Sequence, residues 1–302
     1  MKDFLSTKNM TKDEILGLLD TAEAFRELSR RDVKKAPTLK GKTVLNVFFE
    51  NSTRTRTSFE LAAKRLSADA VNFTASNSST QKGETLIDTI QNLEAMQSDI
   101  MIVRHSCSGS VHFIAENTKS AVINAGDGLN EHPTQAMLDL MTIKRAKHEF
   151  EGLTATIMGD ITHSRVARSN IWAMKTLGMK VKLFGPPTVL PNDMSPFGCH
   201  VCSNIEEAIE DSDVVMALRI QRERQGKLLI PSVREYSAFF GLSPKHLQIM
   251  KKDALIMHPG PINRGVEISS YMADHPQSVI LDQVENGVAI RMALLCMVKK
   301  EG

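Results

Sequence analysis

The sequence predicts an α/β protein with two doubly wound domains, each built on a mainly parallel sheet flanked by helices. Short apolar runs with strand character alternate with stretches of helical periodicity along the chain. The alternation comes in two sets, and the second begins near Gly152. A chain of 302 residues is long enough for two domains, and its 42% hydrophobic and 24% charged residues are typical of a globular protein.

The first set opens with a helix. Thr11 and Glu14 have the spacing of a capping box, and apolar residues recur at helical intervals from Ile15 to Phe25. The elements expected next are a strand at 43–49, a helix ending near 66, a strand at 69–73, a polar loop at 74–83, a helix at 84–96, strands at 99–105 and 120–126 with a short helical stretch between them, and a proline-opened helix at 132–148.

The second set repeats the alternation without repeating the sequence. Its expected elements are strands at 154–160, 180–185, 213–219 and 254–258, and helices at 165–178, 204–210 and near 282–299. We therefore expect one domain at 1–133, with the C-terminal helix 284–302 packing back onto it, and a second domain at 134–283. In open sheets of this kind, ligands bind at the carboxyl ends of the strands.

Composition excludes several classes of function. A net charge of +2 is too small to favour nucleic acid or a membrane surface as partner. We find no signal-peptide pattern and no apolar run of membrane-spanning length, so we expect a cytoplasmic protein. Cys199 and Cys202 form a CxxC, but no second ligand pair accompanies them. We interpret both as ordinary reduced thiols and expect no metal.

The common catalytic motifs are absent from the sequence. The segment 39–43 resembles the end of a phosphate-binding loop, but Ala36 occupies the position that needs glycine. GxGxxG, HExxH and GxSxG patterns are also missing. The sequence therefore predicts chemistry that needs no nucleotide cofactor, no metal and no covalent nucleophile.

The segment ENSTRTRTSFE, residues 50–60, is unusually rich in hydrogen-bond donors and follows a predicted strand. At a helix start, unpaired N–H groups and the positive end of the dipole favour an anion, and arginine binds phosphate in a bidentate manner. Arg54 and Arg56 lie about 200° apart around a helix, so only one can face a given ligand. We expect Arg54 to do so and Arg56 to serve structure. The alternative is helix capping by Ser52 alone.

Several motifs together resemble the carbamoyltransferase family. They are FFENSTRTRTSFE at 48–60 and HPTQAMLDL at 132–140. Within that family, SSTQKGETLIDT at 78–89, LRIQRER at 218–224 and MHPGPINRGVEI at 257–268 are similar to the branch that acts on L-aspartate. The resemblance spans nearly the whole chain. It implies transfer of a carbamoyl group from carbamoyl phosphate to L-aspartate, an early step of pyrimidine synthesis.

The resemblance also assigns residues to the first substrate. Ser52, Thr53, Arg54 and Thr55 would bind the phosphate, and Arg104, His132 and Gln135 the carbamoyl end. Thr55, Arg104 and His132 would surround the carbonyl oxygen. For His132 the residues alone leave a second interpretation open, because a histidine before proline can simply cap the helix that follows.

For the second substrate, the resemblance implies that Arg165, Arg219 and Gln221 bind the two carboxylates of aspartate. Taken alone, the segment around Arg219 would be a solvated charge run. Pro259 and Gly260 would offer backbone carbonyls to the amine, and because many relatives have leucine in place of Gly260, its contact would be through the backbone only. Glu50 would pair with Arg165 and Arg224 to hold a closed state.

Lys82, with Ser78 or Ser79, lies in the polar loop. In the family this loop reaches the site of an adjacent subunit, which implies a homotrimer with shared sites. A regulatory chain or another pyrimidine-pathway enzyme as partner is left open. Two alternatives also remain: a carbamoyltransferase for ornithine or an acylated ornithine, and a non-catalytic subunit that binds a phosphate metabolite.

Overall fold

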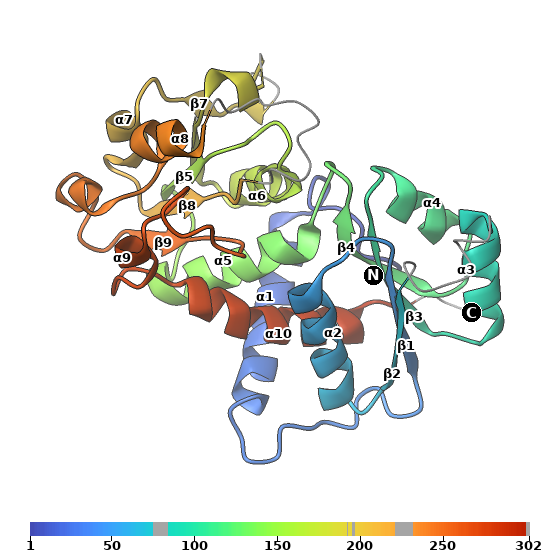
Figure 1. Cartoon of the computed structure of the whole chain (residues 1–302). Helices are drawn as coiled ribbons and strands as arrows, with labels where there is room; N and C mark the ends of the chain where they lie inside the picture. Colours follow the sequence, from blue (N-terminus) through green and yellow to red (C-terminus); the bar gives the residue numbers. More distant parts are fainter. Residues whose placement is uncertain (75–83, 192, 195–196, 221–231, 300–302) are drawn as a thin grey trace. The chain divides into compact units, whose positions relative to one another are not determined.

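A computed structural model of the chain describes residues 1–74, 84–191, 193–194, 197–220 and 232–299. The chain divides into two compact units, Met1–Leu138 with Glu285–Gly302, and Asp139–Val284. Each unit contains one sheet in which all paired strands run parallel, with helices on its two faces (Figure 1). The predicted fold class is therefore confirmed.

The first unit holds a four-stranded sheet with the strand order β2-β1-β3-β4. Its elements are α1 (Lys12–Leu28), β1 (Thr43–Phe48), α2 (Thr53–Arg65), β2 (Asp69–Thr74), α3 (Leu86–Ala95), β3 (Ile100–His105), α4 (Ser110–Glu116), β4 (Ala121–Asp127), the start of α5 (Pro133–Lys147) and most of α10 (Ile280–Met297).

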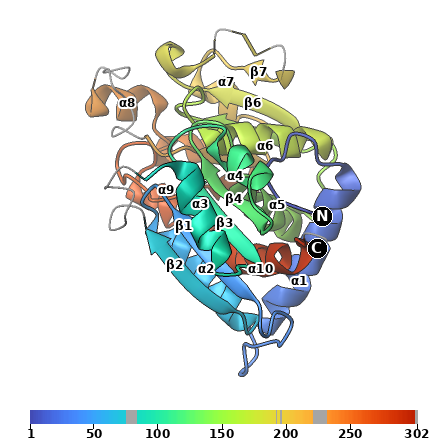
Figure 2. The ribbon, with the colours of Figure 1, turned by 90° about the vertical axis from the view of Figure 1, so that its right-hand side faces the viewer.

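Alternating side chains of β1 and β3 supply the core on both faces of this sheet. Leu45 and Val47 pack with Met101 and Val103 against apolar residues of α3 and α4. Figure 2 shows α3 and α4 in front of the strands, covering that face. Burial of both faces explains why the strands are continuous apolar runs, and it leaves only the strand ends for polar function.

The second unit holds a five-stranded sheet with the order β7-β6-β5-β8-β9. Its elements are the end of α5, β5 (Thr154–Met158), α6 (Arg165–Thr176), β6 (Lys180–Phe184), β7 (His200–Val201), α7 (Ile205–Ile209), β8 (Val214–Ala217), α8 (Val233–Phe240), β9 (Leu255–Met257) and α9 (Ser270–Ala273), with short 3-10 helices at Pro187–Val189 and Pro244–Gln248. Met158, Val215 and Ile256 pack toward α7 and α9 on one face, and α6 covers the other.

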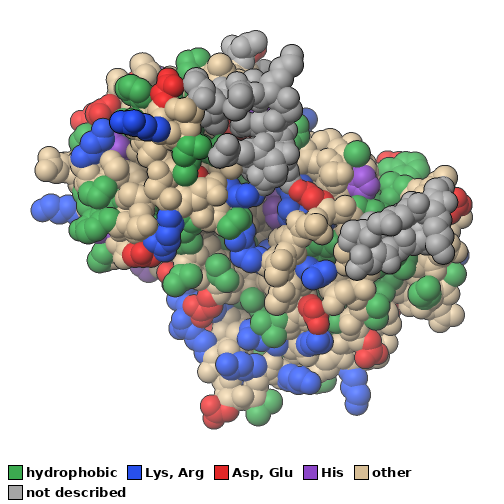
Figure 3. Space-filling view, in the orientation of Figure 1, with side chains coloured by type: hydrophobic (Ala, Val, Ile, Leu, Met, Phe, Trp, Pro, Cys, Tyr) green, Lys and Arg blue, Asp and Glu red, His purple; other side chains and the backbone are tan. Residues whose placement is uncertain are grey.

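Sequence analysis missed β7, α8 and α9. The first has two exposed residues, and α8 buries only Tyr236 among its eight, so neither carries a strong apolar period. None of the described helices has the length and apolar character needed to cross a membrane. On the face shown in Figure 3, basic and acidic side chains are interspersed, as expected for a net charge of +2.

A buried carboxylate fastens the N-terminal segment to the first unit. Phe4 forms an isolated parallel bridge with Ile123 of β4. Beyond it, the side chain of Glu131 accepts hydrogen bonds from the Thr7 amide at 2.8 Å and the Thr7 hydroxyl at 2.9 Å, and from the Ser6 hydroxyl. Glu131 is 3% exposed, so these donors offset the cost of burying its charge.

We predict that Glu131→Ala loosens this N-terminal segment. Loss of hydrogen bonds to a buried charge costs about 1.5–3 kcal/mol, which should speed local amide exchange around Thr7 by about tenfold or more. Hydrogen exchange of the peptide that contains Thr7 measures this. The matched control is Glu14→Ala, which removes an exposed capping-box carboxylate of α1 and should leave that peptide unchanged. Equal exchange in wild type and Glu131→Ala would contradict the prediction.

Candidate active site

In both sheets the strand order reverses beside the first strand of the unit. The reversal falls between β1 and β3 in the first sheet and between β5 and β8 in the second. We call each of these two places the switch point of its sheet. The connections on either side of such a point leave toward opposite faces, which opens a crevice at the carboxyl ends. Most of the described residues assigned to substrates follow the strands that flank these two points, and the rest follow the adjoining strands β4 and β9.

The helix α2 begins directly after β1, with Ser52 as its extended N-cap residue. The Ser52 side chain makes no capping hydrogen bond to the first turn of α2, which lies in the described part of the chain. The structure therefore does not support the alternative that Ser52 serves to cap the helix, because the Ser52 hydroxyl makes no hydrogen bond to the backbone of this described helix. The first-turn N–H groups and the helix dipole present a positive end at this point.

The helix separates the donors of the motif as its geometry requires. Arg54 is exposed at the first turn, whereas Thr55 is 8% exposed. Arg56 is partly buried and donates from Nη1 to the Thr74 hydroxyl of β2 at 3.1 Å. Ser58 accepts from Arg291 of α10 at 3.0 Å. Arg56 and Ser58 thus hold α2 in place, which leaves Arg54 at the helix start.

Arg104 lies at the end of β3, next to the end of β1. It is in register with Phe48, and its Nη1 donates to the Ala125 carbonyl at 3.3 Å. Its Nε lies 3.4 Å from Oε2 of Glu50, and both side chains are largely buried, at 12% and 18% exposure. Because its charge is held by a neighbouring carboxylate, the guanidinium has a fixed orientation at the switch point.

Glu50 was expected to pair with Arg165 and Arg224. Within the first unit, the structure places its carboxylate beside Arg104. Arg224 lies outside the described residues, and the pairing with Arg165 stays a prediction. Sequence reasoning missed the Glu50–Arg104 pair because the two residues are brought together only by the pairing of β1 with β3.

His132 and Gln135 follow β4, at the next strand end. Pro133 begins α5 directly after His132, and the Gln135 amide donates to the His132 carbonyl at 3.0 Å. Both side chains are buried, at 5% and 8% exposure. The Nδ1 of His132 lies 3.4 Å from the Thr134 hydroxyl. This contact orients the ring beyond the end of β4.

Two buried carboxylates hold the turn that carries His132, and sequence reasoning missed both. Asp127 accepts from the Gly109 amide at 2.9 Å and from the Asn130 side chain at 3.0 Å. Its own amide donates to the Glu131 carbonyl at 2.9 Å. Asp127 is fully buried, so the turn between β4 and α5 has little freedom.

The second unit places two arginines at its own switch point. Arg165 is the first residue of α6, after β5, and it is 3% exposed. The N-cap hydroxyl of Ser164 accepts from the Ala167 amide at 3.1 Å, which sets the start of that helix. Arg219 follows β8 and is partly buried. Two guanidinium groups at adjoining strand ends suit a ligand with two carboxylates.

Pro259 and Gly260 follow β9, the neighbour of β8. The Gly260 amide donates to Nδ1 of His258 at 2.7 Å, and Gly260 has φ +65°, a conformation that favours glycine. His258 is buried, and its Nε2 lies 3.0 Å from Oε1 of Glu267. The His258 amide donates to the Gln283 side chain at 3.0 Å. This network fixes the backbone carbonyls of the loop.

Some residues assigned from sequence lie outside the described part of the chain. They are Ser78, Ser79, Lys82, Gln221 and Arg224. The four cysteines are free thiols. Burial raises the pKa of Cys199, and it raises the pKa of Cys202 and of Cys296 to about 11.

Family models match both halves of the chain. Residues 2–145 match the carbamoyl-P binding domain of aspartate/ornithine carbamoyltransferase, and residues 151–298 match the Asp/Orn binding domain. The chain is 60% identical to the aspartate carbamoyltransferase catalytic subunit of Syntrophotalea carbinolica, over 98% of this chain and 95% of the relative. It is 62% identical to that of Campylobacter hominis, over 97% and 96%.

Solved structures agree with these matches. Aspartate transcarbamoylase from Trypanosoma cruzi, in complex with carbamoyl aspartate and phosphate, has a TM-score of 0.89 at 29% identity, covering 99% of this chain and 96% of that one. Ornithine carbamoyltransferase from Thermus thermophilus has a TM-score of 0.88 at 25% identity, covering 99% of both chains.

We predict that Arg54 contributes to phosphate affinity and that Arg56, the other arginine of α2, does not. Arg54→Ala should weaken binding of inorganic phosphate about tenfold or more, since a hydrogen bond to a charged group is worth about 1.5–3 kcal/mol. Titration followed by phosphorus NMR measures this. Arg56→Ala is the matched control: it should lose stability but keep its phosphate affinity within about threefold. Equal losses of affinity in both variants would contradict the assignment.

Proposed function

Because this chain belongs to the aspartate/ornithine carbamoyltransferase family, we propose that it is an aspartate carbamoyltransferase. It transfers the carbamoyl group of carbamoyl phosphate to the amine of L-aspartate and forms N-carbamoyl-L-aspartate and phosphate. The observation that carries this proposal is the 60–62% identity to catalytic subunits of that name over nearly the whole chain. The pairs of cations at the two switch points support it.

The amine nitrogen of aspartate attacks the carbamoyl carbon, and negative charge develops on the carbonyl oxygen. Thr55, Arg104 and His132 are the donors for that oxygen; donors fixed before the reaction are worth about 3 kcal/mol each in comparable sites. The orientations of Arg104 and His132 are set by Glu50 and Thr134, respectively. The site therefore needs little rearrangement as charge develops.

The bond from the carbamoyl carbon to the phosphate oxygen then breaks. The phosphate leaves with the electron pair and takes up the proton that the amine nitrogen loses. The helix start of α2 with Ser52, Thr53 and Arg54 stabilises the charge on the leaving phosphate. Gln135 binds the carbamoyl amide. No metal or covalent intermediate is needed, and orientation of the two bound substrates supplies much of the remaining acceleration.

Arg165 and Arg219 bind the two carboxylates of aspartate, together with Gln221. The backbone carbonyls of Pro259 and Gly260 accept from the amine and direct its lone pair toward the carbamoyl carbon. Since Gly260 has no side chain, only its backbone takes part. A cationic side chain, as in ornithine, would meet the positive charges of Arg165 and Arg219, so the charge pattern favours a second carboxylate.

We propose further that the enzyme is a cytoplasmic homotrimer of the pyrimidine pathway. Lys82 and Ser78 then reach the active site of the adjacent subunit and complete its phosphate and aspartate contacts. This part of the proposal rests on the resemblance of the segment 78–89 to the family. Association with a regulatory chain or another pyrimidine-pathway enzyme stays open.

A carbamoyl-transfer assay with labelled carbamoyl phosphate tests the activity. We predict turnover with L-aspartate and a kcat/KM for L-ornithine lower by a factor of at least about 1,000, because the cationic side chain of ornithine would be repelled by Arg165 and Arg219. Arg54→Ala serves as the inactive control. Ornithine turnover without aspartate turnover would overturn the substrate assignment, and turnover of neither would favour the non-catalytic alternative.

Subunit mixing tests the shared site. Arg54→Ala and Lys82→Ala chains are each expected to be nearly inactive. When both are dissociated and reassembled together at equal amounts, about one quarter of the interfaces combine an intact Arg54 with an intact Lys82. The mixture should recover about that share of wild-type activity. Each variant reassembled alone is the control, and no recovery in the mixture would exclude sharing of the site.

A further inference from the structure

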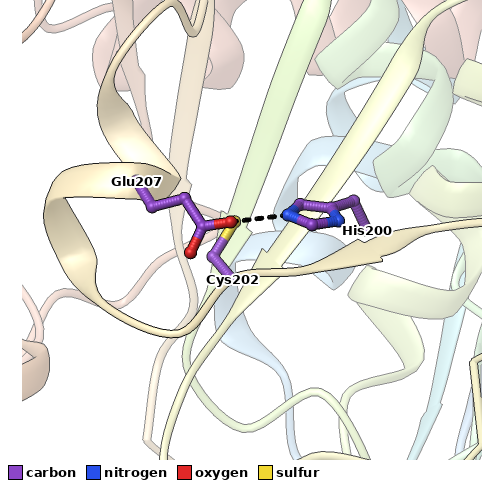
Figure 4. A group of neighbouring side chains, drawn as sticks. All are labelled: His200, Cys202 and Glu207. Atoms are coloured by element: carbon purple, nitrogen blue, oxygen red, sulfur yellow. Dashed lines mark hydrogen bonds and ion pairs between the residues drawn. The ribbon is translucent and has the colours of Figure 1, made fainter.

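Three potential metal ligands meet at an edge of the second sheet, away from the strands that carry the arginines. The Nε2 or Nδ1 of His200, the Sγ of Cys202 and a carboxylate oxygen of Glu207 all lie within 4.8 Å of one another. Figure 4 shows the three side chains pointing toward one another, His200 from β7, Cys202 from the residue after it and Glu207 from α7. None of them belongs to the proposed active site.

Local structure explains why these three converge. His200 begins β7, and the Cys202 amide continues the ladder by donating to the Leu183 carbonyl of β6 at 2.9 Å. In an extended strand, residues two apart share a face, so the side chains of His200 and Cys202 point the same way. The side chain of Asn204 then caps α7 by accepting from the Glu207 amide at 2.8 Å. The cap places Glu207 in the first helical turn, facing the strand.

The carboxylate of Glu207 is already oriented by its neighbours. Its Oε2 accepts from both the amide and the hydroxyl of Ser203, each at 2.8 Å. Its Oε1 lies 2.7 Å from Nε2 of His200. One oxygen is therefore fixed by the backbone turn, and the other is directed at the imidazole. Carboxylates that bind metal ions are commonly held by hydrogen bonds of this kind.

We propose that His200, Cys202 and Glu207 bind a zinc ion. Imidazole nitrogen, thiolate sulfur and carboxylate oxygen are the three ligand types of protein zinc sites, with bonds of about 2.0 Å to nitrogen and oxygen and 2.3 Å to sulfur. Water takes the fourth tetrahedral position. The ion joins the edge strand β7 to α7 and carries no step of the carbamoyl transfer.

Binding needs a rearrangement of the three ligand atoms, which lie within 4.8 Å of one another. Tetrahedral ligands stand about 3.3 Å apart, so His200 must move back from its hydrogen bond with Glu207. The His200 side chain is 63% exposed, so it has room to move. The Glu207 carboxylate keeps its hydrogen bond from the Ser203 hydroxyl. The nearby ammonium of Lys182 donates to the main-chain carbonyls of Glu207 and Glu210 at 2.9 and 3.0 Å, which holds it on α7.

This proposal departs from the interpretation of Cys199 and Cys202 as two ordinary thiols. Cys199 contacts the Phe197 carbonyl through its sulfur, at 3.5 Å. It is three residues from Cys202, so in an extended segment the two side chains point to opposite faces. The ligand pattern is His-x-Cys followed by Glu five residues later, and Cys199 is outside it.

Cobalt(II) substitution tests the site directly on the purified full-length chain. After chelator treatment and dialysis, one equivalent of Co²⁺ should give tetrahedral visible bands and a thiolate-to-cobalt charge-transfer band. Cys202→Ser should lose the charge-transfer band, and His200→Ala and Glu207→Gln should weaken binding at least about tenfold. Cys199→Ser is the matched control and should keep both the band and the affinity.

A second readout covers the risk that Cys202→Ser fails to fold. Zn²⁺ should raise the Tm of the wild type and of Cys199→Ser by several degrees, but leave the Tm of His200→Ala unchanged, since only the folded state of the first two has the site. His200→Ala should keep wild-type carbamoyl-transfer activity, which separates this proposal from the proposed function. Absence of the charge-transfer band in wild type, its loss in Cys199→Ser, or equal affinity in wild type and His200→Ala would each overturn the proposal.

Discussion

The structure depends on one constraint: in a parallel sheet all strands end at the same edge, and the connection that follows each strand must cross one of the two faces of the sheet. In both units the connections change from one face to the other once, between β1 and β3 in the first unit and between β5 and β8 in the second. Helices α2 and α6 follow the strands at these points, so each crevice receives the positive end of a helix dipole. Arg54 and Arg165 add full charges there. Local cationic sites thus arise in a chain with a net charge of only +2.

Buried polar groups turn these positions into fixed ones. A buried carboxylate without partners is costly, so Asp127 and Glu131 restrict the turn to the one arrangement that supplies their donors. His258 and Glu267 do the same for the loop after β9, where the Gly260 amide completes the network. The loops that carry the proposed site residues are therefore held by buried side chains outside the proposed set of substrate ligands. This arrangement suits donors that must be in place before charge develops.

Sequence reasoning predicted the alternation of strands and helices because burial on both faces makes each strand a distinct apolar run. It also placed the segment Ser52 to Thr55 at the start of a helix after a strand, which the structure shows, because these residues are contiguous. It missed the supports of the site, because their partners are distant in sequence: Thr7 and Glu131 are 124 residues apart, and Glu50 meets Arg104 only through strand pairing. It missed α8 because a helix with one buried residue leaves almost no periodic signal.

The cysteine pair shows how spacing misleads when the local conformation is ignored. A CxxC chelates metal when the backbone turns between the two residues, but here Cys202 continues an extended strand, with its amide bonded to Leu183. In that conformation the neighbour on the face of Cys202 is His200, two residues away, and not Cys199. The third ligand, Glu207, is supplied by the helix that Asn204 caps. The spacing of Cys199 and Cys202, without a second ligand pair, argues against a zinc finger. The extended conformation at Cys202 instead favours a site made by His200, Cys202 and Glu207.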